Sequence, residues 1–242
     1  MFRLEKNKLT EKIKAIDNQL SQTNEPLPKT STGLIWLISG RKGSGKSSLL
    51  LNVLKEPVKN GGYKKFFDNI FMVSPTGKAD KKFKKLIDEL EEDDKYYDKL
   101  NDENIKEIIQ KVQTYNQENE EDNPRSLLIL DDCMSDLPKS TEKTSFNDLI
   151  ILARHYRLSV FILCQRYIGF NRTIRANADM ISFFRTDNKK ELATLRDDIN
   201  IDSDMLEALY NFSTEGSLNN FLHINLLSNP ISFYKKFDRI VL

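Results

Sequence analysis

Residues 34–54 read LIWLISGRKGSGKSSLLLNVL: a short apolar run, a glycine-rich turn ending in Gly-Lys-Ser, and the apolar start of a helix. The eight residues from Gly40 to Ser47 match G-x-x-x-x-G-K-[ST], the pattern of phosphate-binding loops. Glycines let successive backbone N–H groups curve around a triphosphate without clashes of Cβ atoms. Because strand, loop and helix follow in the order that this chemistry requires, we expect a nucleotide site here. The alternative is a glycine turn without a ligand.

The residue types of this loop predict individual roles. Lys46 should reach the β and γ phosphates, and the Ser47 hydroxyl should bind Mg²⁺. The positive end of the helix that opens at Lys46 also favours an anion. The predicted nucleotide-binding residues are Gly40, Arg41, Lys42, Gly43, Ser44, Gly45, Lys46, Ser47 and Ser48.

Length and composition fit one α/β domain with short additions, since the 242 residues are 39% hydrophobic and 30% charged. A net charge of +1 gives no bulk attraction to nucleic acid, so any DNA contact must come from local patches. Cys133 and Cys164 lack C-x-x-C or zinc spacing, which suits a reducing compartment. No apolar run approaches the ~18 residues of a membrane span, and residues 1–20 are too charged for a signal peptide. We expect a soluble intracellular protein that does not contact a membrane.

The first 29 residues are expected to form a unit apart from the nucleotide-binding domain at 30–242. Apolar residues recur at helical spacing at positions 9, 13, 16 and 20, which predicts an amphipathic helix before a polar linker at 21–29. Such a helix either packs on its own domain or docks on a neighbouring subunit.

A second motif follows a charged middle segment. A strand is predicted at Ile70–Val73, and residues 80–123 read as helices with solvated faces. The run Leu127–Leu130 then ends in Asp131-Asp132, a Walker B pattern. It places Asp131 beside the metal and lets Asp132 polarise the attacking water. A plain turn at the end of a strand is the alternative.

Lysines 78, 81, 82, 84 and 85 cluster in the middle segment, where they form a solvated helix face or touch DNA.

The remaining sequence predicts further strands and one more polar residue of the site. Ser145 and Asp148 resemble a capping box that opens a helix, with Arg154 and Arg157 near its end. Leu158–Cys164 reads as a buried strand with Gln165 at its tip, where the amide can sense the γ phosphate and orient water. A strand at 180–184 ends in Arg185, and a C-terminal hairpin is predicted from the alternation at 221–226 and 231–234. For the two histidines, at 155 and 223, we expect no catalytic or metal role.

The order GRKGSGKS, LLILDD, RHYRLSVFILCQ and IRANADMISFFR resembles the FtsK–HerA superfamily of P-loop motor ATPases. Within it, the chain is most similar to the poxvirus-type genome-packaging ATPases of large DNA viruses and virophages. The resemblance spans roughly residues 34–185.

The resemblance implies an α/β P-loop NTPase fold, with a central, mostly parallel sheet flanked by helices and the Gln165 strand between the two Walker strands. It implies ATP and Mg²⁺ as cofactors, bound by Lys46 and Ser47, with Asp131 in the metal shell. Asp132 then stands where a glutamate base is more usual. An arginine supplied across a subunit boundary completes each site, and Arg154 matches its place, with Arg157 in reserve.

The function that the resemblance implies is ATP-driven translocation of double-stranded DNA into a viral capsid by a homo-oligomeric ring, a hexamer or pentamer. Its partners would be DNA and a capsid or portal vertex, and its place the virion or a viral factory in the host cytoplasm. The polar loop at 135–145 would face the pore, with Lys139 and Lys143 near DNA; a solvated surface loop is the alternative.

Motifs that other classes of P-loop protein require are missing from this sequence. A switch GTPase needs D-x-x-G and N-K-x-D, but Asp131-Asp132-Cys133-Met134 lacks the glycine and the run at 188–191 reads NKKE. A partition ATPase would have lysine at Arg41 and glycine at Lys42, and a transporter signature is absent. The alternatives left open are a non-motor P-loop ATPase or nucleotide kinase, and a structural nucleotide-binding module.

Overall fold

The computed structural model describes residues 24–139 and 141–241 of the chain. The predicted amphipathic helix of residues 9–20 lies outside the described residues, and the division at residue 29 stays a prediction. No helix in the described part of the chain has the length and apolar character needed to cross a bilayer.

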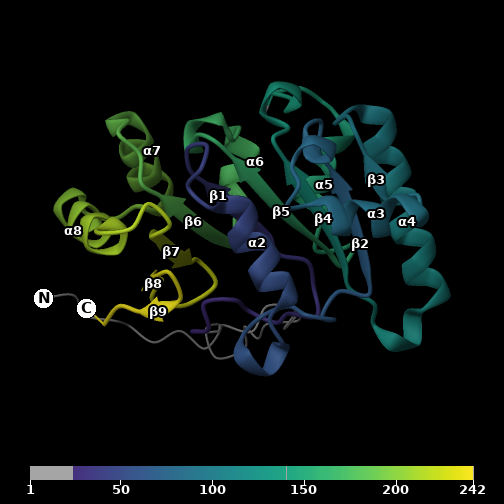
Figure 1. Cartoon of the computed structure of the whole chain (residues 1–242), viewed down its shortest axis with the longest axis horizontal. Coiled ribbons are helices and arrows are strands. Elements are labelled where there is room, and N and C mark those ends of the chain that lie inside the picture. Colours follow the sequence, from purple (N-terminus) through teal and green to yellow (C-terminus); the bar gives the residue numbers. More distant parts are fainter. Residues whose placement is uncertain (1–23, 140, 242) are drawn as a thin grey trace, which may run out of the picture.

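The described residues form one nine-stranded sheet in the order β3-β2-β4-β5-β1-β6-β7-β8-β9 (Figure 1). The first six strands run parallel and the last three antiparallel, which confirms the predicted mostly parallel sheet and the C-terminal hairpin. The strands are β1 Ile35–Ser39, β2 Asn69–Val73, β3 Tyr96–Tyr97, β4 Ser126–Asp131, β5 Leu158–Cys164, β6 Met180–Phe184, β7 Phe221–Asn225, β8 Ser232–Lys235 and β9 Asp238–Arg239.

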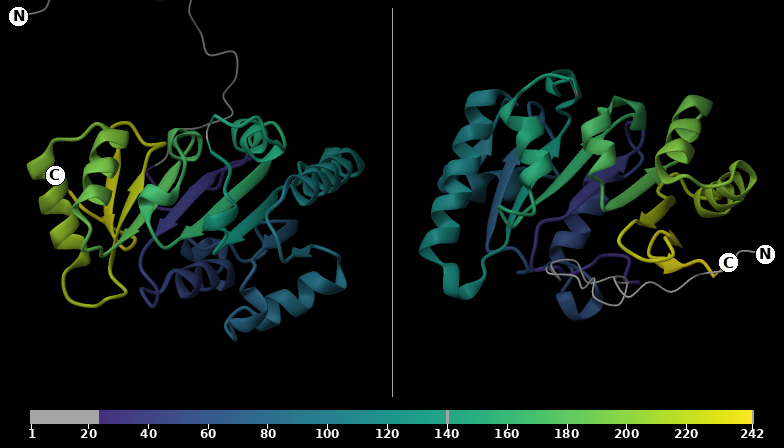
Figure 2. Two further views of the ribbon diagram at one scale, coloured as in Figure 1. Left: turned by 90° about the horizontal axis from the view of Figure 1, so that it is seen from above. Right: turned by 180° about the vertical axis from the view of Figure 1, so that it is seen from behind.

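Helices cover both faces of this sheet. From above, α2 and α3 lie on one side, and α4, α5 and α6 on the other (Figure 2). The α-helices are α2 Lys46–Lys55, α3 Lys84–Glu92, α4 Asp102–Glu118, α5 Ser145–Leu152, α6 Arg172–Ala176, α7 Lys189–Ile199 and α8 Ser203–Thr214. Single 3₁₀ turns are η1 Val58–Asn60, η2 Gly77–Ala79, η3 Glu120–Asp122, η4 Met134–Asp136 and η5 Tyr167–Gly169.

The central strands are buried on both faces, which explains why they read as continuous apolar runs. In β1, Ile35 and Leu37 pack with the helices α4–α8, whereas Trp36 and Ile38 pack with α2 and α3. Because β1 lies between β5 and β6, the phosphate loop begins at the middle of the sheet. The Gln165 strand, β5, pairs with both β1 and the Walker B strand β4, as predicted.

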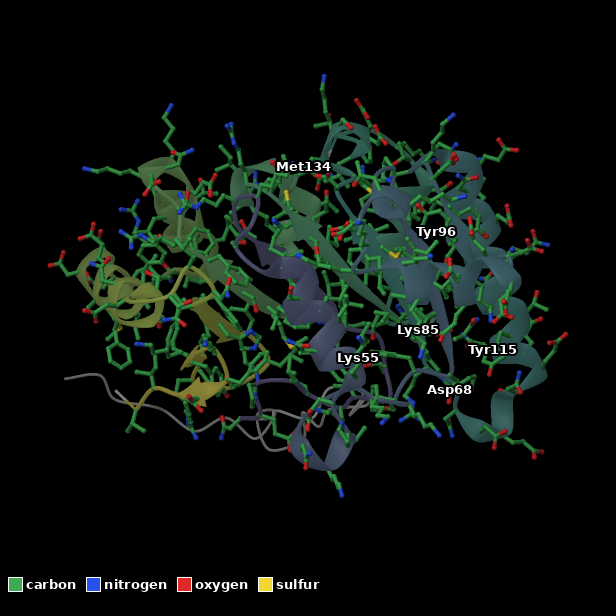
Figure 3. All side chains as sticks on the ribbon, in the orientation of Figure 1. Lys55, Asp68, Lys85, Tyr96, Tyr115 and Met134 are labelled. Atoms are coloured by element: carbon green, nitrogen blue, oxygen red, sulfur yellow. The ribbon has the colours of Figure 1, made fainter. Side chains whose placement is uncertain are left out.

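Two local expectations need correction. Helix α5 is capped one residue earlier than expected, since the hydroxyl of Thr144, not Ser145, accepts the Asn147 N–H at 3.2 Å. A threonine at this position satisfies an amide of the first turn as well as a serine does. The charged middle segment also contains a short strand, β3, which pairs with β2 and was not expected. Charged side chains project from the outer surface of α4 there, so its face is solvated as predicted (Figure 3).

The hairpin holds the start of the described chain against the sheet. His223 is fully buried, with Nδ1 2.9 Å from the Ser182 hydroxyl and Nε2 2.6 Å from the carbonyl of Pro26. Burial lowers the pKa of His223 to about 4, so the ring is neutral near pH 7 and donates from Nε2 to that carbonyl. This histidine therefore connects the segment beginning at residue 24 to the central sheet.

Candidate functional site

The loop between β1 and α2 has the backbone that phosphate binding requires. Gly43 and Gly45 have φ values of 82° and 103°, in the left-handed region that only glycine enters without strain. Gly40 is needed for a different reason, since a Cβ there would lie 2.6 Å from the Cβ of Phe184. Side chains at these positions would therefore distort the loop.

The loop fits an anion. Within the described residues, the N–H groups of Gly43, Gly45, Lys46 and Ser47 have no hydrogen-bond acceptor. Gly45 is the N-cap of helix α2, and Lys46 and Ser47 are its first two residues. The Lys46 ammonium donates to the carbonyls of Gly40 at 2.6 Å and Arg41 at 3.2 Å. Burial lowers the pKa of Lys46, while nearby Asp131 opposes that shift. Unpaired amides, a lysine and a helix N-terminus together form a site for phosphate groups.

Asp131 ends β4 at the same edge of the sheet. Its side chain is 8% exposed and accepts a hydrogen bond from the Ser74 hydroxyl at 3.4 Å. Burial, followed by the charge of Asp132, raises the pKa of Asp131 to about 6, against the opposing effect of Lys46. A carboxylate that is costly to ionise in this setting is stabilised by a bound cation.

The donors present fit Mg²⁺. Mg²⁺ prefers hard oxygen ligands, and it keeps waters and substrate phosphates beside one or two protein groups. Ser47 and Asp131 both face the cleft and supply a hydroxyl and a carboxylate. No group of three or more acidic, histidine or cysteine side chains that could hold a metal ion occurs within residues 24–139 and 141–241.

Asp132 is held between two side chains. It accepts hydrogen bonds from Gln165 Nε2 at 3.0 Å and from the Thr76 hydroxyl at 3.3 Å. Its φ of 57° turns the chain sharply after β4. The structure thus brings together Asp132 and Gln165, which the sequence places 33 positions apart. Asp132 is hydrogen-bonded in an orientation from which it can accept a proton from water.

Ser74 and Thr76 are site residues that sequence reasoning missed. Both follow β2, and β2 lies directly beside β4 in the sheet. The signal available was the run Ser-Pro-Thr-Gly at the end of a predicted strand. That signal becomes specific only when the strand order is known, because carboxyl ends of neighbouring parallel strands meet at one edge.

These residues surround a cleft of about 600 Å³. The cleft is bounded by the phosphate loop, the ends of β4 and β5, and the loop after β2. Its lining residues are Lys42, Gly43, Lys46, Ser47, Thr76, Ala79, Asp80, Lys82, Asp131, Asp132, Leu163 and Gln165.

A second pocket, of about 430 Å³, lies on the other side of the phosphate loop, between α2 and the C-terminal hairpin. Gly45 and Ser48 line it from the loop and helix, and Asn219, Phe221 and Phe237 line it from the hairpin side. The rings of Phe221 and Phe237 meet edge to face, with centroids 5.6 Å apart. The lining combines apolar side chains with several polar and charged ones, so the pocket offers both kinds of contact to an organic ligand.

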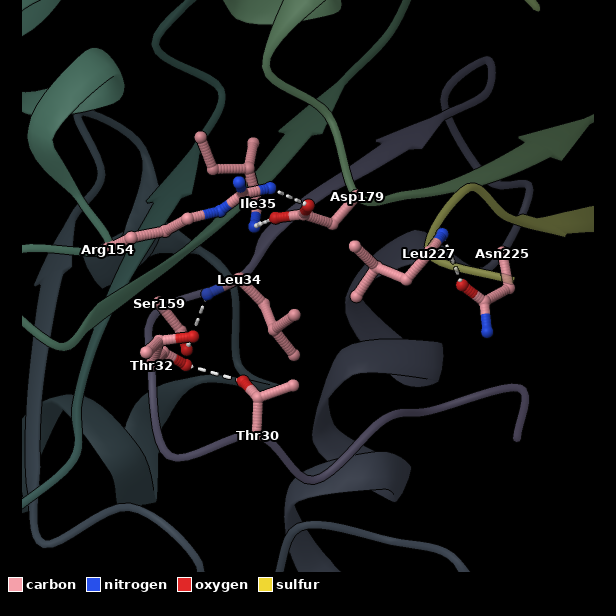
Figure 4. A network of polar contacts seen from close by, with 9 residues as sticks. All are labelled: Thr30, Thr32, Leu34, Ile35, Arg154, Ser159, Asp179, Asn225 and Leu227. Carbon is pink, nitrogen blue, oxygen red and sulfur yellow. Dashed lines mark hydrogen bonds and ion pairs between the residues drawn. The ribbon is translucent and has the colours of Figure 1, made fainter. Parts of the chain in front are cut away.

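Arg154 lies away from this cleft. It follows α5 and pairs with Asp179, at the amino end of β6, whereas the cleft is at the carboxyl ends of the strands (Figure 4). Asp179 is 2% exposed and also accepts the N–H of Ile35 at 2.8 Å, while the Arg154 side chain is 42% exposed. Burial raises the pKa of Asp179, and Ile35 and Arg154 oppose that effect. Arg154 therefore pairs with a buried acid of the same chain.

The other predicted basic residues lie as follows. Arg157 is in the turn before β5, also at the amino ends of the strands, and has a φ of 51°. Arg185 is exposed just after β6, at the carboxyl ends of the parallel strands. Lys139 and Lys143 are exposed on the loop from β4 to α5. The Asn147 side chain fixes that loop by donating to the carbonyl of Lys139 at 2.9 Å.

Solved structures share this fold. The genome packaging NTPase B204 from Sulfolobus turreted icosahedral virus 2, in complex with ATP-γ-S, matches with a TM-score of 0.59 at 18% identity, over 85% of this chain and 98% of that one. B204 from Sulfolobus turreted icosahedral virus, described as a DNA-packaging ATPase, matches with a TM-score of 0.60 at 20% identity, over 84% and 97% of the two chains. At such identities the likeness establishes the fold.

Sequence relatives come from large DNA viruses. The uncharacterized protein 075L of Invertebrate iridescent virus 6 is 28% identical over 185 residues, which are 76% of this chain and 66% of that protein. An uncharacterized protein of Acanthamoeba polyphaga mimivirus is 32% identical over 72 residues, or 28% of this chain and 25% of that protein. The chain thus aligns with just under two thirds of the iridescent virus protein and a quarter of the mimivirus one.

Family comparison agrees with the motifs. Residues 30–220 match the poxvirus A32 protein family, a range that includes the phosphate loop, both aspartates and Gln165. This confirms the resemblance to poxvirus-type packaging ATPases that the sequence indicated. Since the match covers most of the chain and all the residues that form the cleft, the protein belongs to the poxvirus A32 protein family.

Proposed function

We propose that this protein hydrolyses ATP to move double-stranded DNA into a viral capsid. The observation that carries the proposal is the convergence of Lys46, Asp131, Asp132 and Gln165 on one cleft beside a phosphate-binding loop. Support comes from family membership and from the fold shared with B204, which is described as a DNA-packaging ATPase.

The roles of the residues follow from their positions. The loop amides and Lys46 hold the phosphates and offset charge that develops during transfer. Ser47 and Asp131 would hold Mg²⁺, which supplies charge neutralisation on the phosphates. Asp132, oriented by Thr76 and Gln165, accepts the proton of the attacking water. The shorter aspartate reaches one methylene less far than glutamate, so water must approach Asp132 more closely.

The nucleoside is assigned to the second pocket. Because Asp131, Asp132 and Gln165 surround the cleft, the γ phosphate would bind there. The other end of the nucleotide would then pass Ser48, which lines the second pocket. The pocket beyond Ser48 offers Asn219 and three phenylalanines, Phe184, Phe221 and Phe237, which suit an aromatic base with polar edges.

Hydrolysis at subunit interfaces of a ring, a hexamer or pentamer, is the second part of the proposal. Arg154 lies at the amino ends of the strands, whereas the cleft of the same chain lies at their carboxyl ends. If Arg154 acts on ATP, it would therefore act on ATP bound to a neighbouring subunit. Such an arginine stabilises transition-state charge and couples hydrolysis to assembly. Acting in trans requires Arg154 to leave Asp179 or to share its guanidinium between two partners. The capsid or portal vertex as a partner, and the virion or viral factory as location, follow from the packaging role.

The test is the ATPase rate with and without long double-stranded DNA, measured with the mass in solution. Stimulation by DNA together with a ring-sized mass supports the motor, and Lys46→Ala gives the background rate. Turnover by a monomer that DNA leaves unchanged would instead favour a non-motor ATPase or nucleotide kinase. Absence of turnover under all conditions would leave a structural nucleotide-binding module.

A further inference from the structure

One lysine of the loop after β2 is placed differently from its neighbours in sequence. Of the cluster at 78, 81, 82, 84 and 85, Lys82 alone lines the nucleotide cleft. Lys78 pairs with Glu91 at 2.5 Å, and Lys85, labelled in Figure 3, pairs with Glu89 at 3.8 Å. Within the described residues Lys82 has no carboxylate within ion-pair distance. Its charge is therefore available to a ligand of the cleft.

The backbone at Lys82 is fixed on both sides. Its N–H donates to the Asp80 carboxylate at 3.0 Å, and the next residue, Phe83, is completely buried in the core under α3. The start of the loop is held at Ser74, whose carbonyl accepts a hydrogen bond from the Tyr96 hydroxyl at 2.7 Å. The backbone at Lys82 is thus held by a hydrogen bond and by the burial of its neighbour.

The acidic side chains of the cleft favour a further cation beside a bound phosphate. Three carboxylates, those of Asp80, Asp131 and Asp132, line the cleft and repel a γ phosphate. Lys42 and Lys46 line the cleft from the phosphate loop, and Lys82 lines it from the loop after β2. The cleft lining contains no arginine among the described residues.

We infer that Lys82 binds the γ phosphate of ATP in the same subunit, from the loop after β2. This rests on the proposed ATPase function and adds to it a cation that does not depend on ring assembly. The side chain serves as a sensor of the third phosphate, because the β phosphate lies deeper in the loop, beside Lys46. The lysine then distinguishes ATP from ADP before any neighbour is present.

The test compares Lys82→Ala with Lys81→Ala, a matched control from the same loop that lines no part of the cleft. Affinities for ATP-γ-S and for ADP are measured by calorimetry with Mg²⁺ and without DNA. Lys82→Ala should weaken ATP-γ-S binding about tenfold, the loss of one charge-assisted contact, and change ADP binding less than about twofold. Lys82→Arg should restore most of the ATP-γ-S affinity, and Lys81→Ala should change neither value.

Two outcomes would overturn the inference. Equal losses for ATP-γ-S and ADP would mean that Lys82 supports the site generally and does not contact the third phosphate. Unchanged nucleotide affinities with weaker DNA binding would place Lys82 on the DNA path. Failure of the proposed function is distinguishable, because it would appear in the wild-type protein as absence of nucleotide binding or of DNA-stimulated turnover.

Discussion

Asp131→Asn should stabilise the nucleotide-free protein while damaging its site. Asparagine keeps the shape of the side chain, and its amide oxygen can still accept the hydrogen bond from Ser74. What it removes is the charge of a carboxylate that is only 8% exposed. Burial and the neighbouring Asp132 make that charge costly, so its removal should raise the free energy of unfolding.

The magnitude follows from the pKa. Folding raises the pKa of Asp131 from an ordinary 3.8 to about 6. A raised folded-state pKa favours the fold fully below pH 3.8, and this advantage is lost as the pH rises through 6. Relative to the uncharged variant, the wild type should lose about 0.6 kcal/mol of unfolding free energy at pH 4 and about 3 kcal/mol at pH 8.

The assay is denaturant or thermal unfolding at pH 4, 6 and 8, without Mg²⁺ or nucleotide. At pH 8 a gain of about 3 kcal/mol corresponds to roughly 6–12 °C in Tm for a domain of this size. Asp88→Asn, which neutralises an exposed acid on α3, is the control and should shift stability little at any pH.

The same substitution should weaken nucleotide binding, although it stabilises the nucleotide-free protein. With Mg²⁺ present, Asp131→Asn should bind ATP-γ-S more weakly than the wild type, since it offers the cation a neutral amide. A difference in stability between variant and wild type that stays constant from pH 4 to pH 8 would mean that the Asp131 charge does not carry this cost. Nucleotide binding that depends on Mg²⁺ as strongly as in the wild type would mean that Asp131 does not bind the cation.

Three further outcomes are expected. Asp132→Asn should bind ATP-γ-S normally but hydrolyse ATP roughly 10² to 10⁴ times more slowly in single-turnover assays, and an equal loss of binding would contradict its role as base. Arg154→Ala mixed with Lys46→Ala, each inactive alone, should recover part of the ATPase rate because some interfaces pair an intact loop with an intact arginine. No recovery, with subunit exchange verified, would move the trans-acting role to another arginine. Neutralising Lys139 and Lys143 together should flatten the salt dependence of DNA binding by up to about two phosphate contacts, and an unaltered slope would take them off the DNA path.

Strand and loop identity could be read from the sequence because the signals are local. The apolar run before Gly40 and the run at 127–130 both become strands within a residue or so of the prediction. The glycine pattern also fixes its own backbone, since φ values of 82° and 103° at Gly43 and Gly45 are open to few other residues. The order β4-β5-β1 was expected from family resemblance rather than from the residues themselves.

The contacts between distant segments required the tertiary structure. Thr76 and Gln165 meet at Asp132 only because β2, β4 and β5 are adjacent and parallel, which no local pattern encodes. The same packing separates Lys82 from the other lysines of its cluster and brings it to the cleft. It also pairs Arg154 with Asp179 at the far edge of the sheet. Which chemistry the chain carries could be predicted from the sequence, because a phosphate loop and an aspartate pair at the end of a strand are short-range features. Which side chains share the cleft was decided by strand order, because only the packed sheet brings residues far apart in sequence to one edge.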